Sequence, residues 1–252
     1  MENESFIANS ALLKEAYNSA MILQTLKVHA LISGQNGTGK KTLAKQIDEN
    51  ALLIDAKDLQ NEIQYNKNFQ TTPTIIVENI DDISNIDALL AWLDQYHIRL
   101  IGLSSKESLQ PKLQELFTIN IEITPLKQRE EDIRPLANKF AKEAANVLAM
   151  QDKKPKRLII NTSNNAHSLR KSIYFSYLFE SIGENEIMML LENYFEEHFE
   201  GENNYRDFSY IFEAPLLKSA QKKYKSQLQM AKYLGLNRIT LRKKLDQHKE
   251  LL

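Results

Sequence analysis

The chain has 252 residues and a formal net charge of −1 at pH 7, and 26% of its residues are charged. This length suits one α/β domain with one or two small helical domains. The absence of cysteine excludes a disulfide framework, a thiolate metal site and a cysteine nucleophile. Because no signal peptide and no bilayer-spanning apolar run is recognisable, we expect a cytoplasmic protein without a membrane partner.

The first expected elements are a helix from Asn9 to about Thr25 and a short strand that ends at a glycine-rich loop. The spacing from Gly34 to Lys40 fits a Walker A loop (P-loop), in which glycines let backbone N–H groups surround a phosphate. An alternative is a glycine turn with a solvated lysine. We expect ATP or ADP to bind at Gly34, Gln35, Asn36, Gly37, Thr38, Gly39, Lys40, Lys41 and Thr42.

One position of this loop departs from the general motif. The residue after Lys40 is Lys41 and not the Ser or Thr whose hydroxyl binds Mg²⁺, and Thr42 follows one place late. A second cation favours a polyphosphate but competes with a metal ion.

Four further apolar runs predict strands that alternate with helices, such as the helix from Asn85 to Tyr96. Continuous apolar character predicts buried parallel strands, whereas the alternating last run predicts an edge strand. The runs are Ala51–Ile54, Thr74–Val77, Arg99–Leu103 and Ile119–Ile123. We therefore expect a doubly wound α/β domain over residues 1–124, with the nucleotide at the carboxyl ends of its strands.

From Glu130 the sequence is helical almost throughout. Residues 125–182 predict a helical subdomain, which opens with a turn before the acidic helix start at Glu130. The basic run Lys153–Arg157 is interpreted as a solvated loop rather than a nucleic-acid contact. Residues 183–204 predict an acidic linker helix that packs on another part of the protein.

Residues 205–252 predict a helix-turn-helix. From Ala214 onward the chain has ten Lys and Arg against two acids, while the remainder has 22 bases and 31 acids, and clustered cations favour the phosphate backbone of DNA. Gly235 is expected to adopt a positive φ in the turn. The apolar seam is Leu228, Ala231, Leu234, Leu236, Leu241 and Leu245.

The second helix of this motif should begin near Asn237 or Arg238 and face the major groove of double-stranded DNA. The DNA-contacting set is Asn237, Arg238, Thr240, Leu241, Arg242, Lys243 and Lys244. The alternative is a helical hairpin whose lysines are only solvated.

Together, the loop and the C-terminal segment resemble the sigma-54-dependent transcription activators, which combine an AAA+ domain with a Fis-type DNA-binding domain. The resemblance also covers the segment from Thr124 to Ile133 that enters the lid, and Asn164 to Leu169 near the second sensor. It implies an AAA+ P-loop α/β fold with a helical lid, followed by an all-α Fis-type helix-turn-helix. The position of Lys41 is usually glutamate in that family, and the second-sensor arginine position falls on His167. We expect no receiver domain, since the other parts leave no room for one.

The departures from this family concern hydrolysis and sigma-factor contact. The family's Walker B motif ends in Asp-Glu, but here the strand ends in Glu78-Asn79. Glu78 is the one candidate for the Walker B acid and for a Mg²⁺ ligand, whereas Asn79 cannot take a proton. The sigma-contacting loop is missing, and Gln110 and Leu116 stand where two arginines act in trans. The chain is therefore identified as a degenerate member.

Three hypotheses follow. The first is a DNA-binding transcriptional regulator that binds nucleotide but hydrolyses it weakly or not at all. The second is an active ATPase in which Asp81 or Asp82 supplies the base. The third is an adaptor that forms hetero-oligomers with a full-length activator. We expect a dimer through the C-terminal domain, with a higher oligomer and a contact to an RNA polymerase sigma factor left open. Ser104 and Ser105 stand where a polar sensor residue would face the γ-phosphate, but two serines that close a strand are interpreted as a turn.

Overall fold

The computed structural model describes residues 6–65, 73–106, 109–152, 154–179 and 182–252. Lys153, the first residue of the basic run, lies outside these ranges. The chain divides into two compact units, Met1–Ser181 and Ile182–Leu252, which we call the N-terminal and the C-terminal unit. Within the described ranges, no helix is both long enough and apolar enough to cross a bilayer.

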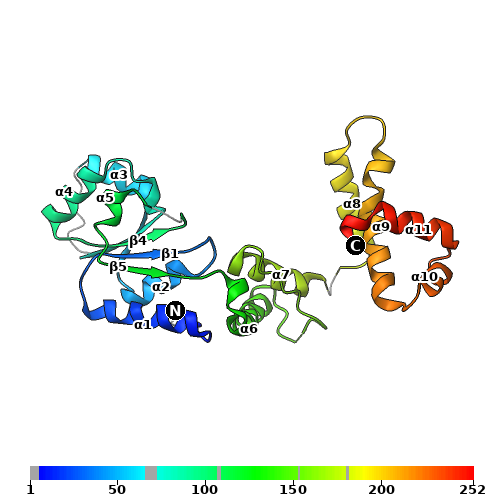
Figure 1. Cartoon of the computed structure of the whole chain (residues 1–252), viewed down its shortest axis with the longest axis horizontal. Coiled ribbons are helices and arrows are strands. Elements are labelled where there is room, and N and C mark those ends of the chain that lie inside the picture. The colour runs from blue at the N-terminus through cyan, green and yellow to red at the C-terminus, as the bar shows by residue number, and fades with distance from the viewer. Residues whose placement is uncertain (1–5, 66–72, 107–108, 153, 180–181) are drawn as a thin grey trace. The chain divides into compact units, whose positions relative to one another are not determined.

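The N-terminal unit is built on a parallel sheet that has five strands in the described part of the chain (Figure 1). Its strand order is β2-β3-β4-β1-β5, so β1 lies between β4 and β5. The strands are β1 (Ala30–Ser33), β2 (Leu52–Asp55), β3 (Thr74–Glu78), β4 (Arg99–Ser104) and β5 (Ile119–Glu122). The predicted edge position of β5 is confirmed, but β2 forms the other edge and is only half-buried.

Helices cover both faces of this sheet. Figure 1 shows α1 (Ala11–Thr25) and α2 (Lys40–Ile47) on one face, where Leu23 and Leu43 pack against Ile32 of β1. The opposite face carries α3 (Ala56–Gln64), α4 (Ile86–Tyr96) and α5 (Pro111–Gln114), together with the 3₁₀ turn η1 (Ile80–Asp82). This two-sided burial explains why the central strands are apolar without alternation.

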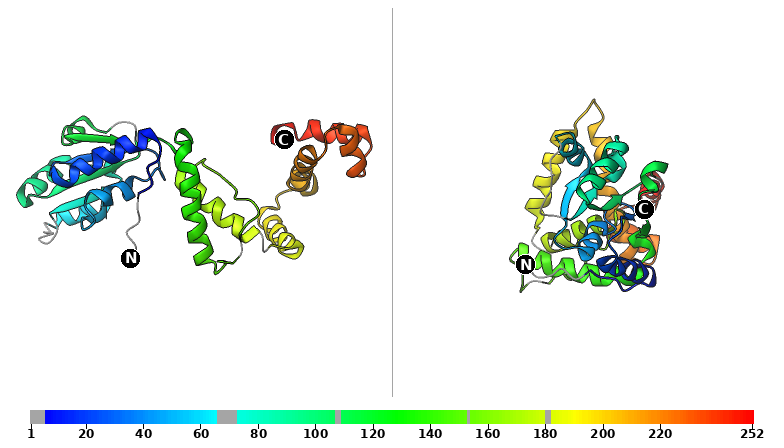
Figure 2. Two further views of the ribbon diagram at one scale, coloured as in Figure 1. Left: turned by 90° about the horizontal axis from the view of Figure 1, so that it is seen from below. Right: turned by 90° about the vertical axis from the view of Figure 1, so that its left-hand side faces the viewer.

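The lid follows the sheet within the same unit. It contains η2 (Leu126–Gln128), α6 (Glu130–Val147) and α7 (Asn165–Phe179), and Figure 2 shows the two helices against each other. Its core is formed by Leu126, Ala137, Ala144, Leu169, Ile173 and Tyr177. The helix start predicted at Glu130 is confirmed.

The C-terminal unit is all-helical in its described residues. It contains α8 (Glu184–His198), α9 (Asn204–Lys223), α10 (Gln227–Tyr233), α11 (Arg238–Gln247) and η3 (Lys249–Leu251). Ala231 and Leu241 of the predicted seam are buried with Leu217, but Leu228 is 57% exposed, which corrects its assignment to the seam. Gly235 has φ +65° in the turn before α11, as predicted.

Candidate nucleotide-binding site

The glycine-rich loop leads from the carboxyl end of β1 into α2. Its glycines have φ values of 144° at Gly34, 75° at Gly37 and 107° at Gly39, a region that favours glycine. Close packing adds a second reason. A Cβ at Gly34 would lie 2.4 Å from the Ile123 carbonyl oxygen, and one at Gly37 would lie 2.7 Å from His167 Cδ2. The loop conformation therefore requires glycine at these positions, and the absence of side chains there also lets a phosphate approach the backbone.

Lys40 begins α2 and extends its ammonium group across the loop. Its Nζ donates to the carbonyl oxygens of Gly34 (2.6 Å) and Gln35 (3.0 Å) and to Ser105 Oγ (2.9 Å). Burial lowers the pKa of Lys40, while the nearby carboxylates of Asp81 and Glu78 act in the opposite direction. Positive charge thus collects where the helix N-terminus already favours an anion.

Strand β3 ends beside this loop with Glu78 and Asn79. The Lys41 ammonium lies 3.2 Å from Glu78 Oε2, so the carboxylate that we expected to hold Mg²⁺ is paired with a lysine. Asn79 has φ 53°, and its Nδ2 donates to Asp55 Oδ2 at 2.8 Å. A bond from the Lys57 N–H and this bond lower the pKa of Asp55. The residue where the family resemblance places the catalytic base is thus an amide held by the end of β2.

Ser104 and Ser105, interpreted from sequence as a turn, connect β4 to the phosphate-binding loop. Ser104 Oγ donates to Asp81 Oδ1 at 2.5 Å, and Ser105 Oγ donates to Asn36 Oδ1 at 2.8 Å. The sequence already offered a sensor role for both serines, because they close a strand, and the carboxyl end of β4 lies next to that of β1.

The residues at this edge do not fit a Mg²⁺ site. Position 41 has no hydroxyl group, and each nearby carboxylate has a partner: Glu78 pairs with Lys41, Asp81 accepts from Ser104, and Asp82 lies 3.7 Å from Lys106. Within the described ranges, no group of three or more His and acidic residues is placed to hold a metal ion. Magnesium takes octahedral oxygen coordination, which these paired groups do not offer.

The start of α7 contacts the loop directly. Asn165 Nδ2 donates to the Asn36 carbonyl oxygen at 2.8 Å, and the Ala166 N–H donates to the Gly37 carbonyl oxygen at 3.0 Å. Asn165 is buried, and its Oδ1 accepts from the Leu126 N–H at 2.7 Å. His167 is exposed beside Gly37, so the lid brings it to the predicted loop.

Arg129 and Asp132 form a buried link that sequence reasoning assigned only to a turn and a helix start. Arg129 Nη2 donates to the Thr38 carbonyl oxygen at 3.1 Å, and its Nη1 lies 3.5 Å from Asp132 Oδ2. Asp132 also accepts from the Ser10 N–H (3.0 Å) and Ser10 Oγ (2.7 Å) at the start of α1. Burial lowers the pKa of Arg129, and Asp132 opposes this change. One pair thus connects α1, the loop and the lid.

Two cavities of the N-terminal unit are relevant to ligand binding. The smaller one, of about 210 Å³, is lined by the loop residues Thr38, Gly39 and Thr42 together with residues from the lid and the segment before α1. Phe6, Phe140 and Arg170 belong to this lining, so the cavity offers apolar and cationic walls beside the loop. It is our candidate for the nucleoside part of a ligand.

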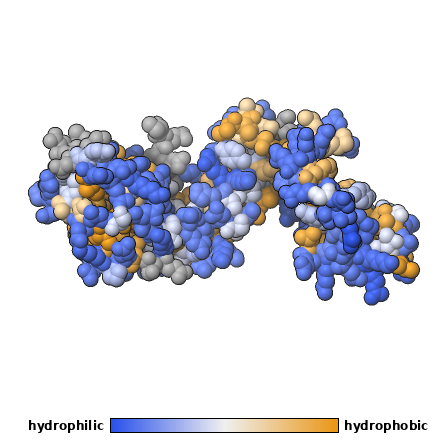
Figure 3. All heavy atoms as spheres, turned by 90° about the horizontal axis from the view of Figure 1, so that it is seen from above, coloured by the Kyte–Doolittle hydropathy of each residue, from blue (hydrophilic) through white to orange (hydrophobic). Residues whose placement is uncertain are grey.

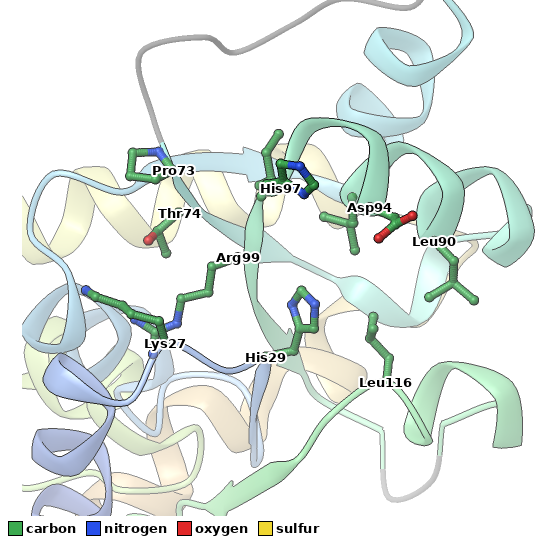
Figure 4. Close-up of a pocket in the computed structure, with 11 residues that line it drawn as sticks. Lys27, His29, Pro73, Thr74, Leu90, Asp94, His97, Arg99 and Leu116 are labelled. Atoms are coloured by element: carbon green, nitrogen blue, oxygen red, sulfur yellow. The ribbon is translucent and has the colours of Figure 1, made fainter.

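A larger cavity, of about 610 Å³, lies at the amino ends of the strands (Figure 4) and contains no residue of the loop. Its charged and titratable side chains are largely structural. Arg99 donates to the carbonyl oxygens of Val28 (2.9 Å) and Leu23 (2.7 Å), and His29 Nδ1 accepts from the Leu100 N–H. Burial and the charge of Arg99 lower the pKa of His29. Cavity size therefore does not locate the nucleotide site.

In the C-terminal unit, α11 presents Arg238, Arg242 and Lys243 to solvent. Asn237 caps the helix by accepting from the Thr240 N–H at 2.7 Å. One predicted DNA contact needs correction, because Leu241 is 1% exposed and packs in the helical core. Lys244 forms an ion pair with Glu213 of α9, and its side chain is 30% exposed.

Comparison with known proteins supports the fold. No protein-family model and no curated protein matches the sequence. Among solved structures, NtrX from Brucella abortus in complex with ATP is similar with a TM-score of 0.59 and 16% identity, over 98% of this chain and 69% of that one. The structure of NtrX in complex with ADP gives a TM-score of 0.58 and 15% identity over the same shares of the two chains. A point variant of RuvB from Thermotoga maritima gives only 0.48 and 16%, over 97% and 90%. The chain therefore shares the fold of NtrX, with a parallel five-stranded sheet in its described residues and a glycine-rich loop after β1.

Proposed function

We propose that the chain is a cytoplasmic, DNA-binding transcriptional regulator on an AAA+ scaffold, which binds ATP or ADP and hydrolyses it weakly or not at all. The observation that supports weak or absent hydrolysis is the presence of Asn79. An amide cannot take a proton from water, and its Nδ2 is bonded to Asp55. Nucleotide binding is supported by the loop, the Lys40 ammonium and the neighbouring cavity. The similar NtrX chain was crystallised with ATP and with ADP.

The DNA-binding part of the proposal concerns α10, the turn at Gly235 and α11 as a Fis-type helix-turn-helix. Exposed cations on α11, among them Arg238 and Arg242, support it because a recognition helix needs cations for the phosphates on both sides of the major groove. Regulation as a dimer on a two-fold site follows from the symmetry of such motifs.

An active ATPase is the second candidate, with Asp81 or Asp82 as base. Asp81 accepts from Ser104 Oγ at 2.5 Å and from the Ser105 N–H at 3.4 Å, so it is already engaged. The third candidate is an adaptor for a full-length activator or a sigma factor. Exposed apolar side chains on α8, such as Met188 and Met189, favour an interaction surface but do not identify the partner.

The proposal is tested by measuring ATP affinity by calorimetry and phosphate release, each with and without duplex DNA. We expect ATP to bind to the wild type and to bind much more weakly to Lys40→Ala. Phosphate release should be no faster in the wild type than in Lys40→Ala. Sustained turnover that Lys40→Ala abolishes would instead establish the ATPase hypothesis.

A further inference from the structure

The pairing of Lys41 with Glu78 suggests how the site meets the charge of a nucleotide. Lys41 follows Lys40 in the first turn of α2, and its Nζ lies 3.2 Å from Glu78 Oε2 at the end of β3. The Lys41 side chain is 55% exposed and that of Glu78 is 37% exposed, so the pair stands open to a ligand. An ammonium has three N–H donors, and the bond to Glu78 uses one of them.

The position of Lys41 differs from that of Lys40. Lys40 Nζ is turned to the carbonyl oxygens of Gly34 and Gln35 and to Ser105, on the side of β4. Lys41 points to the end of β3. In the sheet, β4 lies between β3 and β1. Two ammonium groups therefore stand over the ends of different strands.

We propose that the Lys41 ammonium, held by Glu78, supplies the positive charge that a divalent cation would supply to the nucleotide phosphates, so that the site binds metal-free nucleotide. This inference rests on the nucleotide binding proposed above. Glu78 acts as a positioning residue in this arrangement. The lack of a hydroxyl at position 41 and the engaged carboxylates of Asp81 and Asp82 agree with it.

The test measures the affinity for ATP by calorimetry in excess Mg²⁺ and in excess EDTA, at matched ionic strength. For the wild type we expect ATP to bind in EDTA at least as tightly as in Mg²⁺, because excess Mg²⁺ converts free ATP into its complex with the metal. Lys41→Thr, which replaces the ammonium by a hydroxyl, should lose about tenfold or more in EDTA, because a charge-assisted bond to phosphate is removed. Lys14→Thr is the matched control, since Lys14 is exposed on α1 and away from the loop.

Glu78→Gln separates the two possible roles of that carboxylate. If Glu78 holds a metal ion, this variant loses affinity only in Mg²⁺. If it positions Lys41, the affinity relative to wild type changes by the same factor in both buffers. Unfolding curves should show that each variant is folded.

The outcomes are distinguishable. A wild type that loses tenfold or more in EDTA overturns the inference but leaves nucleotide binding intact. If Lys41→Thr binds ATP in EDTA with the affinity of the wild type, Lys41 does not replace the metal ion. The proposed function is again unaffected. Failure of ATP to bind in either buffer overturns both.

Discussion

The side-chain amide of Asn165 donates to the backbone carbonyl oxygen of Asn36 at 2.8 Å, and so joins the first turn of the lid helix α7 to the phosphate-binding loop. The two residues are 129 positions apart in the chain. Asn165 has φ 51° and also accepts from the Leu126 N–H, so one residue fixes the loop, the lid and their connection.

The first prediction concerns this residue. Asn165→Gly keeps the backbone conformation but removes the side-chain bonds, and should lower the free energy of unfolding by about 1–3 kcal/mol. Asn165→Ala should cost about 1 kcal/mol more, because alanine is strained at positive φ. Urea unfolding followed by circular dichroism measures both. Equal stability of the two variants would show that φ at position 165 is not constrained.

The second prediction concerns the buried pair of Arg129 and Asp132. Asp132→Asn should lower the free energy of unfolding by about 3–5 kcal/mol, because it leaves the buried guanidinium without its counter-charge. Arg129→Met should in addition weaken ATP binding, since the bond to the Thr38 carbonyl is removed. Arg134→Met is the control, because Arg134 is exposed on α6, which begins directly after Arg129. If Arg129→Met binds ATP with wild-type affinity, the bond from Arg129 to Thr38 does not contribute to nucleotide binding.

The third prediction is a pH dependence of the C-terminal unit. Bonds from Lys244 and His248 lower the pKa of Glu213 from its ordinary value of 4.5. A lowered folded-state pKa means that the ionised carboxylate stabilises the fold above the unfolded pKa, and that this contribution is lost as the pH falls through the folded pKa.

Glu213→Gln should therefore destabilise the unit by about 1 kcal/mol or less at pH 7, because the group is partly exposed. The difference from wild type should shrink as the pH is lowered below 4.5. Hydrogen exchange of amides in α9 and α11 reports this locally. A difference that persists unchanged in acid would argue against the charge as its cause.

The fourth prediction tests the DNA-binding face. Arg238→Ala combined with Arg242→Ala should reduce affinity for duplex DNA and reduce the slope of log affinity against log salt by about one for each phosphate that is no longer bound. A double variant of Lys14 and Lys57 to Ala, exposed lysines of the N-terminal unit, removes the same charge. If both double variants bind DNA equally, α11 is not the interface.

The fifth prediction tests the expected dimer. Phe199 and Phe212 are 59% and 68% exposed, and both line a cavity of about 440 Å³ between α8 and α9. Hydrophobic atoms are visible at the surface of this unit in Figure 3. Phe212→Asp should convert a dimer to a monomer in sedimentation experiments, whereas Leu228→Asp, at an exposed apolar residue of α10 that does not line this cavity, serves as a comparison. A wild-type monomer would contradict the expectation.

Local patterns predicted the fold well because each depends on neighbouring residues. Apolar runs predicted the buried strands, the glycine spacing predicted the loop, and Gly235 predicted the turn before α11. The assignment of Leu228 to the buried seam was wrong. A helix as short as α10 has too few turns for its apolar spacing to define which side faces the core.

The contacts of the candidate site were harder to predict because they join distant segments. Arg129 and Asp132 belong to an ordinary acidic helix start in sequence, and only the fold brings Ser10 to them. The partner of Glu78 depends in the same way on the adjacency of β3 and α2, so the sequence supported a metal ligand where the structure has an ion pair. Pairings between segments this far apart in the chain, such as the 37 positions from Lys41 to Glu78, leave no local pattern.

The strand order also has a consequence for how the chain folds during synthesis. β1 pairs with β4 and β5, which emerge from the ribosome some 70 to 90 residues later, from Ala30 to Ile101 and Ile119. The strand before the phosphate-binding loop therefore has no partner until residue 104 has been made, whereas β2 and β3 can already pair. Nascent chains that end before β4 should expose the apolar strand β1 and depend on chaperones at that stage.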